Sequence, residues 1–318
     1  MASIVVIGGT GHIGSYLVPR LIDAGHAVIC VSRGQRAPYT TDPAWRRVTH
    51  AILDRAAEES RQRFGLAIAA LGGQVVIDLT CYTPQSAVQL VDALAGRDTH
   101  LLHCGTIWVH GPSTGAAATE EEPRRPLGEY GARKAAIERY LLGATRAGRV
   151  AATVLHPGHL VGRGWAPINP AGNFNVHIFE DLAAGHGVRL GTLGAETLHH
   201  VHADDVAQAL TLAVSRPSAA TGESFYVVSP QAITFRDYAQ RMADWFGAPA
   251  RITCLPFEDW RHGVADRDAA VTLDHLRHSS NYSSDKARRL LGYSPRYSSL
   301  AAVQESVGSL MNREGVAS

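Results

Sequence analysis

Short runs of apolar residues alternate with amphipathic, helix-length segments along the first half of the chain. The apolar runs are rich in β-branched residues and predict strands over residues 4–7, 28–31, 75–79, 100–104 and 153–155. The segments between them include predicted helices over residues 13–24, 85–94 and 131–142. Continuous apolar strands separated by helices are typical of a parallel sheet that is covered on both faces. The pattern therefore predicts an α/β protein with a doubly wound parallel sheet.

The pattern changes after Pro157. Residues 158–194 are rich in Gly, Pro, Asn and His, with one helix predicted near residues 176–184. A helix over residues 204–214 and a strand over residues 224–228 then resume the pattern of the sheet. We therefore predict a sheet domain of residues 1–157 plus 197–229. A smaller α/β lobe that binds substrate is predicted to comprise residues 158–196 plus 230–318.

Composition and charge narrow the class of protein. The 318 residues are 45% hydrophobic, enough for a sizeable core, and 30 basic residues are balanced by 29 acidic ones. A formal net charge of +1 predicts neither a nucleic-acid nor an anionic membrane partner. No apolar run approaches the roughly 20 residues of a membrane span, and the first residues lack the pattern of a secretory signal. The four cysteines are scattered, so we expect a cytoplasmic protein without disulfides. The expected partner is a small-molecule substrate.

A glycine-rich turn follows the first predicted strand and opens the first helix. It comprises Gly8, Gly9, Thr10, Gly11, His12, Ile13 and Gly14. Glycines allow a tight turn and let the backbone approach a pyrophosphate, while the helix N-terminus offers free N–H groups to the phosphates. The turn predicts a Rossmann-type dinucleotide site; the alternative is a purely structural turn. Pro19 lies inside the helix and is expected to bend it without ending it.

The residues after the second predicted strand bear on the choice of dinucleotide. A carboxylate there hydrogen-bonds the ribose of NAD, whereas an arginine accommodates the extra phosphate of NADP. The chain has Ser32, Arg33 and Arg36 there and no carboxylate. Because a guanidinium is planar and permanently charged, this favours NADP. The alternative is NAD, with both arginines solvated.

Tyr130 and Lys134 form a YxxxK pattern on a predicted helix, where residues four apart share a face. Moving a hydride to or from a carbon requires moving a proton on its oxygen. The usual pKa of tyrosine, near 10, is too high for easy exchange, but a nearby ammonium and an oxidised nicotinamide lower it. Tyr130 is then a general acid or base, tuned by Lys134, which also binds the cofactor. Thr106 follows an apolar strand and is expected to orient the reacting oxygen.

These motifs together resemble the extended short-chain dehydrogenase/reductase family, the NAD-dependent epimerase/dehydratase-like group that contains UDP-galactose 4-epimerase. The family's glycine signature matches Gly8, Gly11 and Gly14, and its catalytic residues match Thr106, Tyr130 and Lys134. The resemblance covers nearly the whole chain and implies an NAD(P)-dependent enzyme. It also implies that Asp54 contacts the adenine and that Pro157 lines the nicotinamide pocket. Leu79 and Thr80, at the end of a predicted strand, complete the expected cofactor site.

Several departures from the family pattern bear on the substrate. Ile107 and Trp108 stand where the sugar-nucleotide dehydratases carry Asp-Glu, so elimination of water is not expected. Leu198 stands where UDP-sugar epimerases usually have an arginine, and the asparagine expected after the sixth strand is missing too. Tyr82, Trp108 and His159 are predicted to line the substrate pocket.

Three functions stay open. The first is an oxidoreductase that transfers hydride between a nicotinamide and a carbinol or keto carbon of a small molecule. The second is an NAD-dependent sugar epimerase, including nucleotide-sugar epimerases, that oxidises its substrate only transiently. The third is a non-catalytic nucleotide- or RNA-binding relative, against which the Thr106, Tyr130 and Lys134 set and the near-neutral charge argue.

The histidines and the assembly complete the predictions. On a strand, His200 and His202 would share a face while His199 points away, and no third ligand stands at the usual spacing, so no metal site is predicted. Family resemblance implies a homodimer formed through the helices at residues 85–94 and 131–142. Their apolar residues Val88, Val91, Ile137 and Leu141 are expected to supply the seam.

Overall fold

A seven-stranded sheet forms the larger part of the protein in the computed structural model, which describes residues 1–113 and 116–311. The strand order is β11-β6-β5-β4-β1-β2-β3, and all neighbouring strands are parallel. The bounds are β1 (Ser3–Ile7), β2 (Ala27–Ser32), β3 (Thr49–Ile52), β4 (Val75–Asp78), β5 (His100–Cys104), β6 (Ala151–Pro157) and β11 (Ser224–Val227). The chain moves outwards from β1 in both directions, which is the order of a doubly wound Rossmann sheet. The predicted fold class is confirmed.

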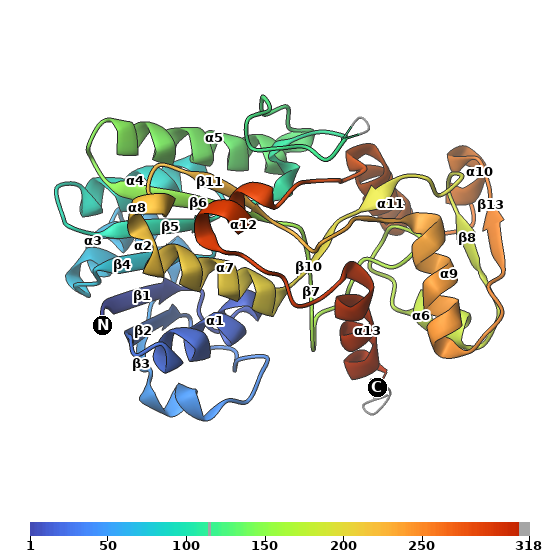
Figure 1. Ribbon diagram of the computed structural model, residues 1–318, viewed down its shortest axis with the longest axis horizontal. Coiled ribbons are helices and arrows are strands. Elements are labelled where there is room, and N and C mark those ends of the chain that lie inside the picture. The colour runs from blue at the N-terminus through green and yellow to red at the C-terminus, as the bar shows by residue number, and fades with distance from the viewer. Residues whose placement is uncertain (114–115, 312–318) are drawn as a thin grey trace.

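Helices cover both faces of this sheet (Figure 1). Ile4 and Val6 of β1 face a core shared with α1 and α7, whereas Val5 and Ile7 face a core shared with α3, α4 and α5. Successive strand residues point to opposite faces, so a strand covered on both sides must be apolar throughout. The helices are α1 (His12–Asp23), α2 (Arg55–Ser60), α3 (Phe64–Ala70), α4 (Pro84–Leu94), α5 (Gly128–Arg146), α7 (Ala203–Ser215) and α8 (Pro217–Ala220).

Helix α1 runs through Pro19 without a break. Proline has no N–H, so the carbonyl of Ser15, four residues earlier, loses its helical hydrogen bond. The hydroxyl of Thr40 donates to that carbonyl at 3.0 Å. The loop after β2 thus replaces the missing donor, which lets the helix continue towards Asp23.

A smaller lobe with its own core lies beside the sheet, on the right of Figure 1. Its core includes Phe179, Leu190, Tyr238, Met242 and Trp260. Its elements are β7 (His159–Val161), α6 (His177–Ala183), β8 (Val188–Leu190), β9 (Thr197–Leu198), β10 (His200–His202), β12 (Ile233–Thr234), α9 (Phe235–Phe246), β13 (Ile252–Cys254), α10 (Phe257–Arg261), α11 (Asp266–His278), α12 (Asp285–Leu291) and α13 (Ser299–Leu310). Among these, α12 packs on the sheet domain, because Ala287 and Leu291 join the core beneath α1 and α7. The predicted division at residue 230 therefore separates α12 from the core in which it packs.

The sheet has an edge strand that the hydrophobic pattern did not indicate. Strand β3 has exposed or half-buried residues throughout, so it lacks the apolar run that marks the central strands. The short helices α2 and α3 that follow it were also missed. Edge strands face solvent along one side, and this weakens their signal in the sequence.

The residues expected to form a dimer seam lie inside the protomer. Val91 and Ile137 are 0% exposed and Leu141 is 1% exposed, and all three belong to the core between α4, α5 and the sheet. That part of the prediction is wrong, because helical periodicity identifies apolar residues without identifying what covers them. Val88 is half-buried. The homodimer itself stays a prediction.

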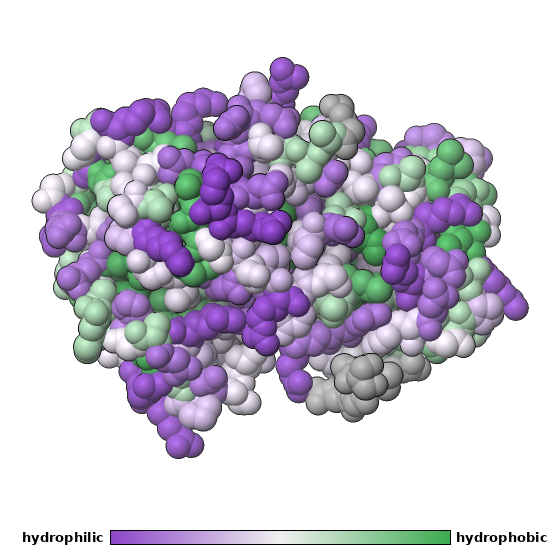
Figure 2. Space-filling model, in the orientation of Figure 1, coloured by the Kyte–Doolittle hydropathy of each residue, from purple (hydrophilic) through white to green (hydrophobic). Residues whose placement is uncertain are grey.

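Over residues 1–113 and 116–311, no helix combines the length and the apolar character needed to cross a membrane. Figure 2 shows a mostly hydrophilic face on which apolar residues lie in small, separate groups.

Candidate active site

The glycine turn is tight and held close to its neighbours. Gly8 has φ +82°, and a Cβ there would lie 2.5 Å from Cγ2 of Thr80. A Cβ on Gly14 would lie 2.2 Å from the carbonyl oxygen of Gly9. No side chain caps α1 at Gly11, so the first N–H groups of this twelve-residue helix have no side-chain acceptor at that position. Such an uncapped N-terminus next to a glycine turn suits a pyrophosphate.

A cavity of about 530 Å³ lies at this turn. Its lining comes from the carboxyl ends of four neighbouring strands, the edge at which open α/β sheets bind ligands. The predicted cofactor residues that line it are Gly8, Thr10, Gly11, Ser32, Arg33, Arg36, Asp54 and Thr80. These eight predicted residues therefore lie together on the wall of one cavity.

The charged residues of this cavity differ in how they are held. Asp54 accepts a hydrogen bond from the backbone N–H of Ala57 and caps α2. Its neighbour Arg55 is bound to Asp78 and Glu59 at 2.7 and 2.6 Å. Arg36 donates to the hydroxyl of Tyr39 at 2.7 Å. Arg33 makes no ion pair or hydrogen bond through its side chain with the residues that the structure describes.

Four residues of the predicted glycine motif do not line this cavity: Gly9, His12, Ile13 and Gly14. Gly9 and Gly14 face each other across the junction of strand and helix, where there is no room for a side chain. The ring of His12 is buried and stacks on Trp165 at a centroid distance of 4.9 Å. Gly9 and Gly14 therefore shape the turn, and the His12 ring supports the loop that carries Trp165.

A second cavity of about 400 Å³ lies next to the first, and Tyr82 lines both. It brings together Thr106, Tyr130 and Lys134 from the end of β5 and from α5. The other predicted residues on its wall are Ile13, Leu79, Trp108, Pro157 and His159. All predicted catalytic and substrate-pocket residues are thus assembled at one place.

Tyr130 is 44% exposed and its ring contacts Trp108 edge to face at 6.1 Å. Burial of the hydroxyl raises the pKa of Tyr130 to about 12, and a hydrogen bond with Thr106 opposes that change. The sequence analysis expects the ammonium of Lys134, helped by an oxidised nicotinamide, to lower this pKa, whereas burial raises it among the protein's own residues. Among the protein's own residues, the neutral phenol is favoured.

Lys134 is 2% exposed and held by the main chain. Its Nζ donates to the carbonyl oxygens of Cys81 and Cys104, both at 2.8 Å, and lies 5.0 Å from the ring centroid of Tyr82. Burial lowers the pKa of this ammonium. Lys134 therefore ties α5 to the ends of β4 and β5, one helical turn from Tyr130.

A buried polar chain, which sequence reasoning missed, supports Thr106 from below. The backbone N–H of Thr106 donates to Nδ1 of His156 at 3.1 Å. Nε2 of the same ring lies 3.2 Å from Glu138, which binds Arg124 through two contacts of 2.7 and 2.9 Å. Glu138 stands eight residues after Tyr130 on α5, so it points to the same side as Lys134.

Removing the carboxylate of this chain should destabilise the fold. Burial by itself would raise the pKa of Glu138, but His156 and Arg124 outweigh it and leave that pKa well below its usual value. We expect Glu138→Ala to lower the free energy of unfolding by about 3–5 kcal/mol, because it leaves the buried Arg124 charge uncompensated. Urea unfolding at pH 7 measures this loss. Glu129→Ala, which removes an exposed pair with Arg133 on the same helix, is the control and should cost less than about 1 kcal/mol.

The same contacts fix a pH dependence. A folded pKa below the unfolded value of about 4.3 means that the unfolded chain binds the proton more readily. The contribution of Glu138 is therefore complete above that value and declines as the pH falls through the folded pKa. The stability of Glu138→Ala should fall less steeply in acid than that of the wild type. If the free energy of unfolding fell equally steeply with falling pH in the two proteins, the role given to Glu138 would be contradicted.

The lobe adds further residues to the wall of the second cavity. Trp165, Phe174, Asp274 and His275 line it, and none of them was predicted. Trp108 donates through Nε1 to Nε2 of His159 at 3.3 Å and stacks on His278 at 3.9 Å. No sequence motif marks these positions, which come from a loop and a helix far from Tyr130 in the chain.

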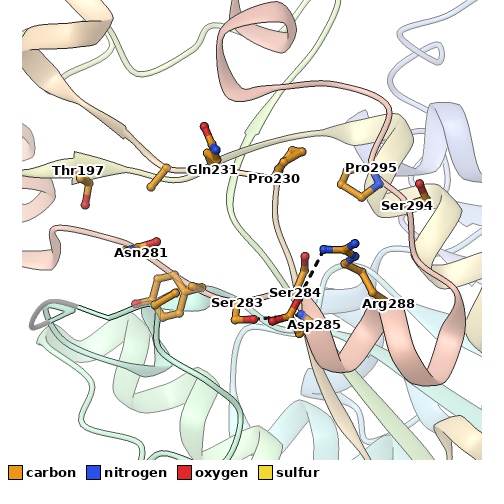
Figure 3. A pocket seen from close by; sticks show the side chains of 13 residues that line it. Thr197, Pro230, Gln231, Asn281, Ser283, Ser284, Asp285, Arg288, Ser294 and Pro295 are labelled. Carbon is orange, nitrogen blue, oxygen red and sulfur yellow. Dashed lines mark hydrogen bonds and ion pairs between the residues drawn. The ribbon is translucent and has the colours of Figure 1, made fainter.

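A separate cavity of about 620 Å³ lies away from these residues (Figure 3). It contains none of the predicted site residues that the structure describes. Its charged residues, Asp285 and Arg288, pair with each other at 3.5 Å, and Ser283 accepts a hydrogen bond from the backbone of Asp285. These three residues of its wall therefore already have partners within the cavity.

Two of the three histidines near β10 have hydrogen-bond partners, whereas the buried ring of His200 packs edge to face on Tyr238 and has no hydrogen bond among the described residues. His199 is bonded to the carbonyl of Ser229 and to the N–H of Tyr282, and His202 pairs with Glu305 and stacks on Tyr297. Among the described residues, no three His, Cys, Asp or Glu side chains are grouped so that they could hold a metal ion.

This chain is similar to a known enzyme family, to characterised relatives and to solved structures. A sequence model of the NAD dependent epimerase/dehydratase family matches residues 4–228. The dTDP-6-deoxy-L-talose 4-dehydrogenase (NAD(P)(+)) of Kitasatospora kifunensis is 28% identical over 316 residues, covering 96% of this chain and 94% of that protein. The 2'-dehydrokanamycin reductase of Streptomyces kanamyceticus is 28% identical over 261 residues, or 80% and 70% of the two chains. The structure of UDP-glucose 4-epimerase from Thermotoga maritima with UDP-glucose superposes with a TM-score of 0.73 at 21% identity, covering 98% and 99%.

Proposed function

The chain belongs to the NAD-dependent epimerase/dehydratase family, and from this premise we propose that it is an oxidoreductase acting on a carbinol or keto carbon of a small molecule. The observation that carries the proposal is the assembly of Thr106, Tyr130 and Lys134 around one cavity. That cavity meets the glycine-lined cavity at Tyr82, so a dinucleotide in the first extends into the second. The relatives of this chain include a dehydrogenase named for NAD(P)(+), a reductase and an epimerase.

The cavity residues fit a dinucleotide. The glycine turn and the uncapped start of α1 would hold the pyrophosphate, with Ser32, Arg33 and Asp54 around the adenosine. Ile13, Leu79 and Pro157 would face the nicotinamide end. When bound, the nicotinamide supplies or accepts the hydride.

The chain's own residues handle the proton. In reduction, the Tyr130 hydroxyl donates its proton to the substrate oxygen as negative charge develops there, and in oxidation it takes that proton back. The Thr106 hydroxyl, bonded to Tyr130, orients the same oxygen. Lys134 supplies a positive charge one helical turn away, which stabilises the phenolate.

We also propose that the preferred cofactor is NADP. Arg33 lines the glycine cavity directly after β2 and has no side-chain ion pair or hydrogen bond within residues 1–113 and 116–311, so its guanidinium is available for a phosphate. Asp54, the nearest carboxylate after β3, is occupied as the cap of α2.

Arg33→Asp should reverse the cofactor preference. A charge-assisted hydrogen bond is worth about 1.5–3 kcal/mol, so we expect kcat/KM for NADPH to fall by roughly 10- to 100-fold, with little loss for NADH. The ratio of the two kcat/KM values measures the effect. Arg46→Asp, at an exposed arginine that does not line the cavity, is the control. An unchanged ratio in Arg33→Asp would remove the basis for the NADP assignment.

The reaction is tested with the substrates that the relatives' names indicate. Purified protein is given dTDP-6-deoxy-L-talose with NADP+ or NAD+, and 2'-dehydrokanamycin with NADPH or NADH, while absorbance at the nicotinamide band is followed. Stoichiometric change of the nicotinamide supports the proposed oxidoreductase. Inversion of a sugar carbon without net cofactor change would identify the epimerase alternative. Cofactor binding with neither reaction, across sugar and simple ketone panels, would favour a binding protein.

A further inference from the structure

One carboxylate stands out on the wall of the catalytic cavity. Twenty residues line this cavity, and Lys134 and Asp274 are the two Lys, Arg, Asp or Glu residues among them. Lys134 is already bonded to two carbonyl oxygens. The Asp274 carboxylate has no hydrogen bond or ion pair with any residue that the structure describes. A negative charge without a partner is thus available to whatever occupies the cavity.

Asp274 is an exposed residue of α11 that lines the same cavity as Tyr130, and two ring contacts connect Tyr130 to its neighbour His275. Trp108 contacts Tyr130 at a centroid distance of 6.1 Å and His275 at 5.4 Å. His275 is the next residue after Asp274 on α11, and both line the same cavity. A substrate whose oxygen meets Tyr130 therefore extends along Trp108 towards α11.

His275 adds a second hydrogen-bond acceptor on this wall. Its Nδ1 lies 2.9 Å from the carbonyl oxygens of Gly172 and Val271, and because carbonyls only accept, Nδ1 must carry the hydrogen. Burial lowers the pKa of His275 to about 4, so the ring is neutral at pH 7 and Nε2 is an acceptor. Asp274 and His275 together favour a group that donates hydrogen bonds.

The cavity is poorly suited to an anionic substrate. A nucleotide sugar brings two phosphates, which proteins bind with Arg, Lys or clustered N–H groups. The cavity has no arginine, and Leu198, at the position where the UDP-sugar epimerases usually have one, is 1% exposed in the core of the lobe. The rest of the wall is mostly apolar and includes the rings of Trp108, Trp165 and Phe174. Such rings attract a cation through their faces.

We infer that the substrate carries a protonated amine, as in an aminosugar, and that Asp274 is the specificity-determining residue that binds it. This inference rests on the proposed function, because it names the substrate class of the same cavity.

The test uses binding, which does not depend on turnover. The full chain, saturated with NADP+, is titrated in a calorimeter with neamine, an aminosugar with four amines, with its fully N-acetylated form, and with dTDP-glucose. We expect neamine to bind at least about tenfold more tightly than its acetylated form, since the acetylated form cannot make the charge-assisted contact. Asp274→Asn should lose about that factor for neamine and leave the acetylated form unchanged. Asp266→Asn, at an exposed carboxylate on the same helix, should bind neamine like the wild type.

Tighter binding of dTDP-glucose, no measurable binding of neamine, or equal affinities of Asp274→Asn and the wild type would each overturn the inference. Hydride transfer to neutral ketones in the assay above, with no preference for amines in the titration, would support the proposed oxidoreductase and overturn the inference about amines. Amine binding without any hydride transfer would instead count against the oxidoreductase.

Discussion

Replacing Tyr130 with Phe should lower kcat by about 10²–10⁴-fold while dinucleotide binding stays as in the wild type. The change removes one oxygen, the group proposed to exchange a proton with the substrate. The aromatic ring remains and keeps its contact with Trp108, so the cavity wall is preserved. The partner residue Thr106 stays held through its backbone by His156.

The loss is measured as kcat under saturating cofactor, with dinucleotide affinity determined separately by fluorescence titration. Tyr140→Phe is the matched control, because Tyr140 lies on the same helix and its hydroxyl accepts a weak contact from Arg149. We expect that control to keep wild-type kcat. A Tyr130→Phe enzyme with undiminished kcat would mean that another group moves the proton.

Gly14→Ala is the substitution from which we expect the largest effect on the cofactor site. The added methyl carbon would meet the carbonyl oxygen of Gly9 at 2.2 Å and its Cα at 2.6 Å, and backbone cannot rotate aside as a side chain can. Helix α1 must therefore move away from the turn. A misplacement on the order of 1 Å can cost about a hundredfold, so we expect dinucleotide affinity to fall by at least that factor. The free energy of unfolding should fall by about 3 kcal/mol, at the upper end for overpacking.

Gly143→Ala provides the opposite expectation for the same chemical change. Gly143 lies within α5, and its added carbon would have Arg146 as its nearest neighbour at 3.8 Å. Alanine is favoured over glycine in a helix by about 0.8–1 kcal/mol, so this variant should be slightly more stable and bind dinucleotide normally. Chemical unfolding and calorimetric titration of both variants test the pair. Similar behaviour of the two would show that the crowding at Gly14 has no consequence.

Long-range packing, not local pattern, produced the parts of the site that were missed. Asp274 and His275 lie on α11, more than 130 residues after Tyr130. Nothing in their surrounding sequence distinguishes them from the acidic and histidine residues elsewhere on that helix. The polar chain from Thr106 to Arg124 is similar, because it joins β5, β6, α5 and a loop that meet only in the folded protein.

The sequence by itself determined the features that depend on neighbours along the chain. A strand buried on both faces must be apolar, a glycine turn must lack side chains, and residues four apart on a helix must share a face. These local rules were enough to predict the parallel sheet, the tight glycine turn, and the position of Tyr130 and Lys134 on one face of α5.

Only the tertiary structure decided which surfaces meet. It buried Val91, Ile137 and Leu141 inside the protomer, packed α12 on the sheet, and brought an unpaired Asp274 to the catalytic cavity. The hydrophobic effect has no direction, so an apolar stripe specifies burial without specifying its partner. The role in specificity that we propose for Asp274 likewise depends on folding, which places this residue on a cavity wall.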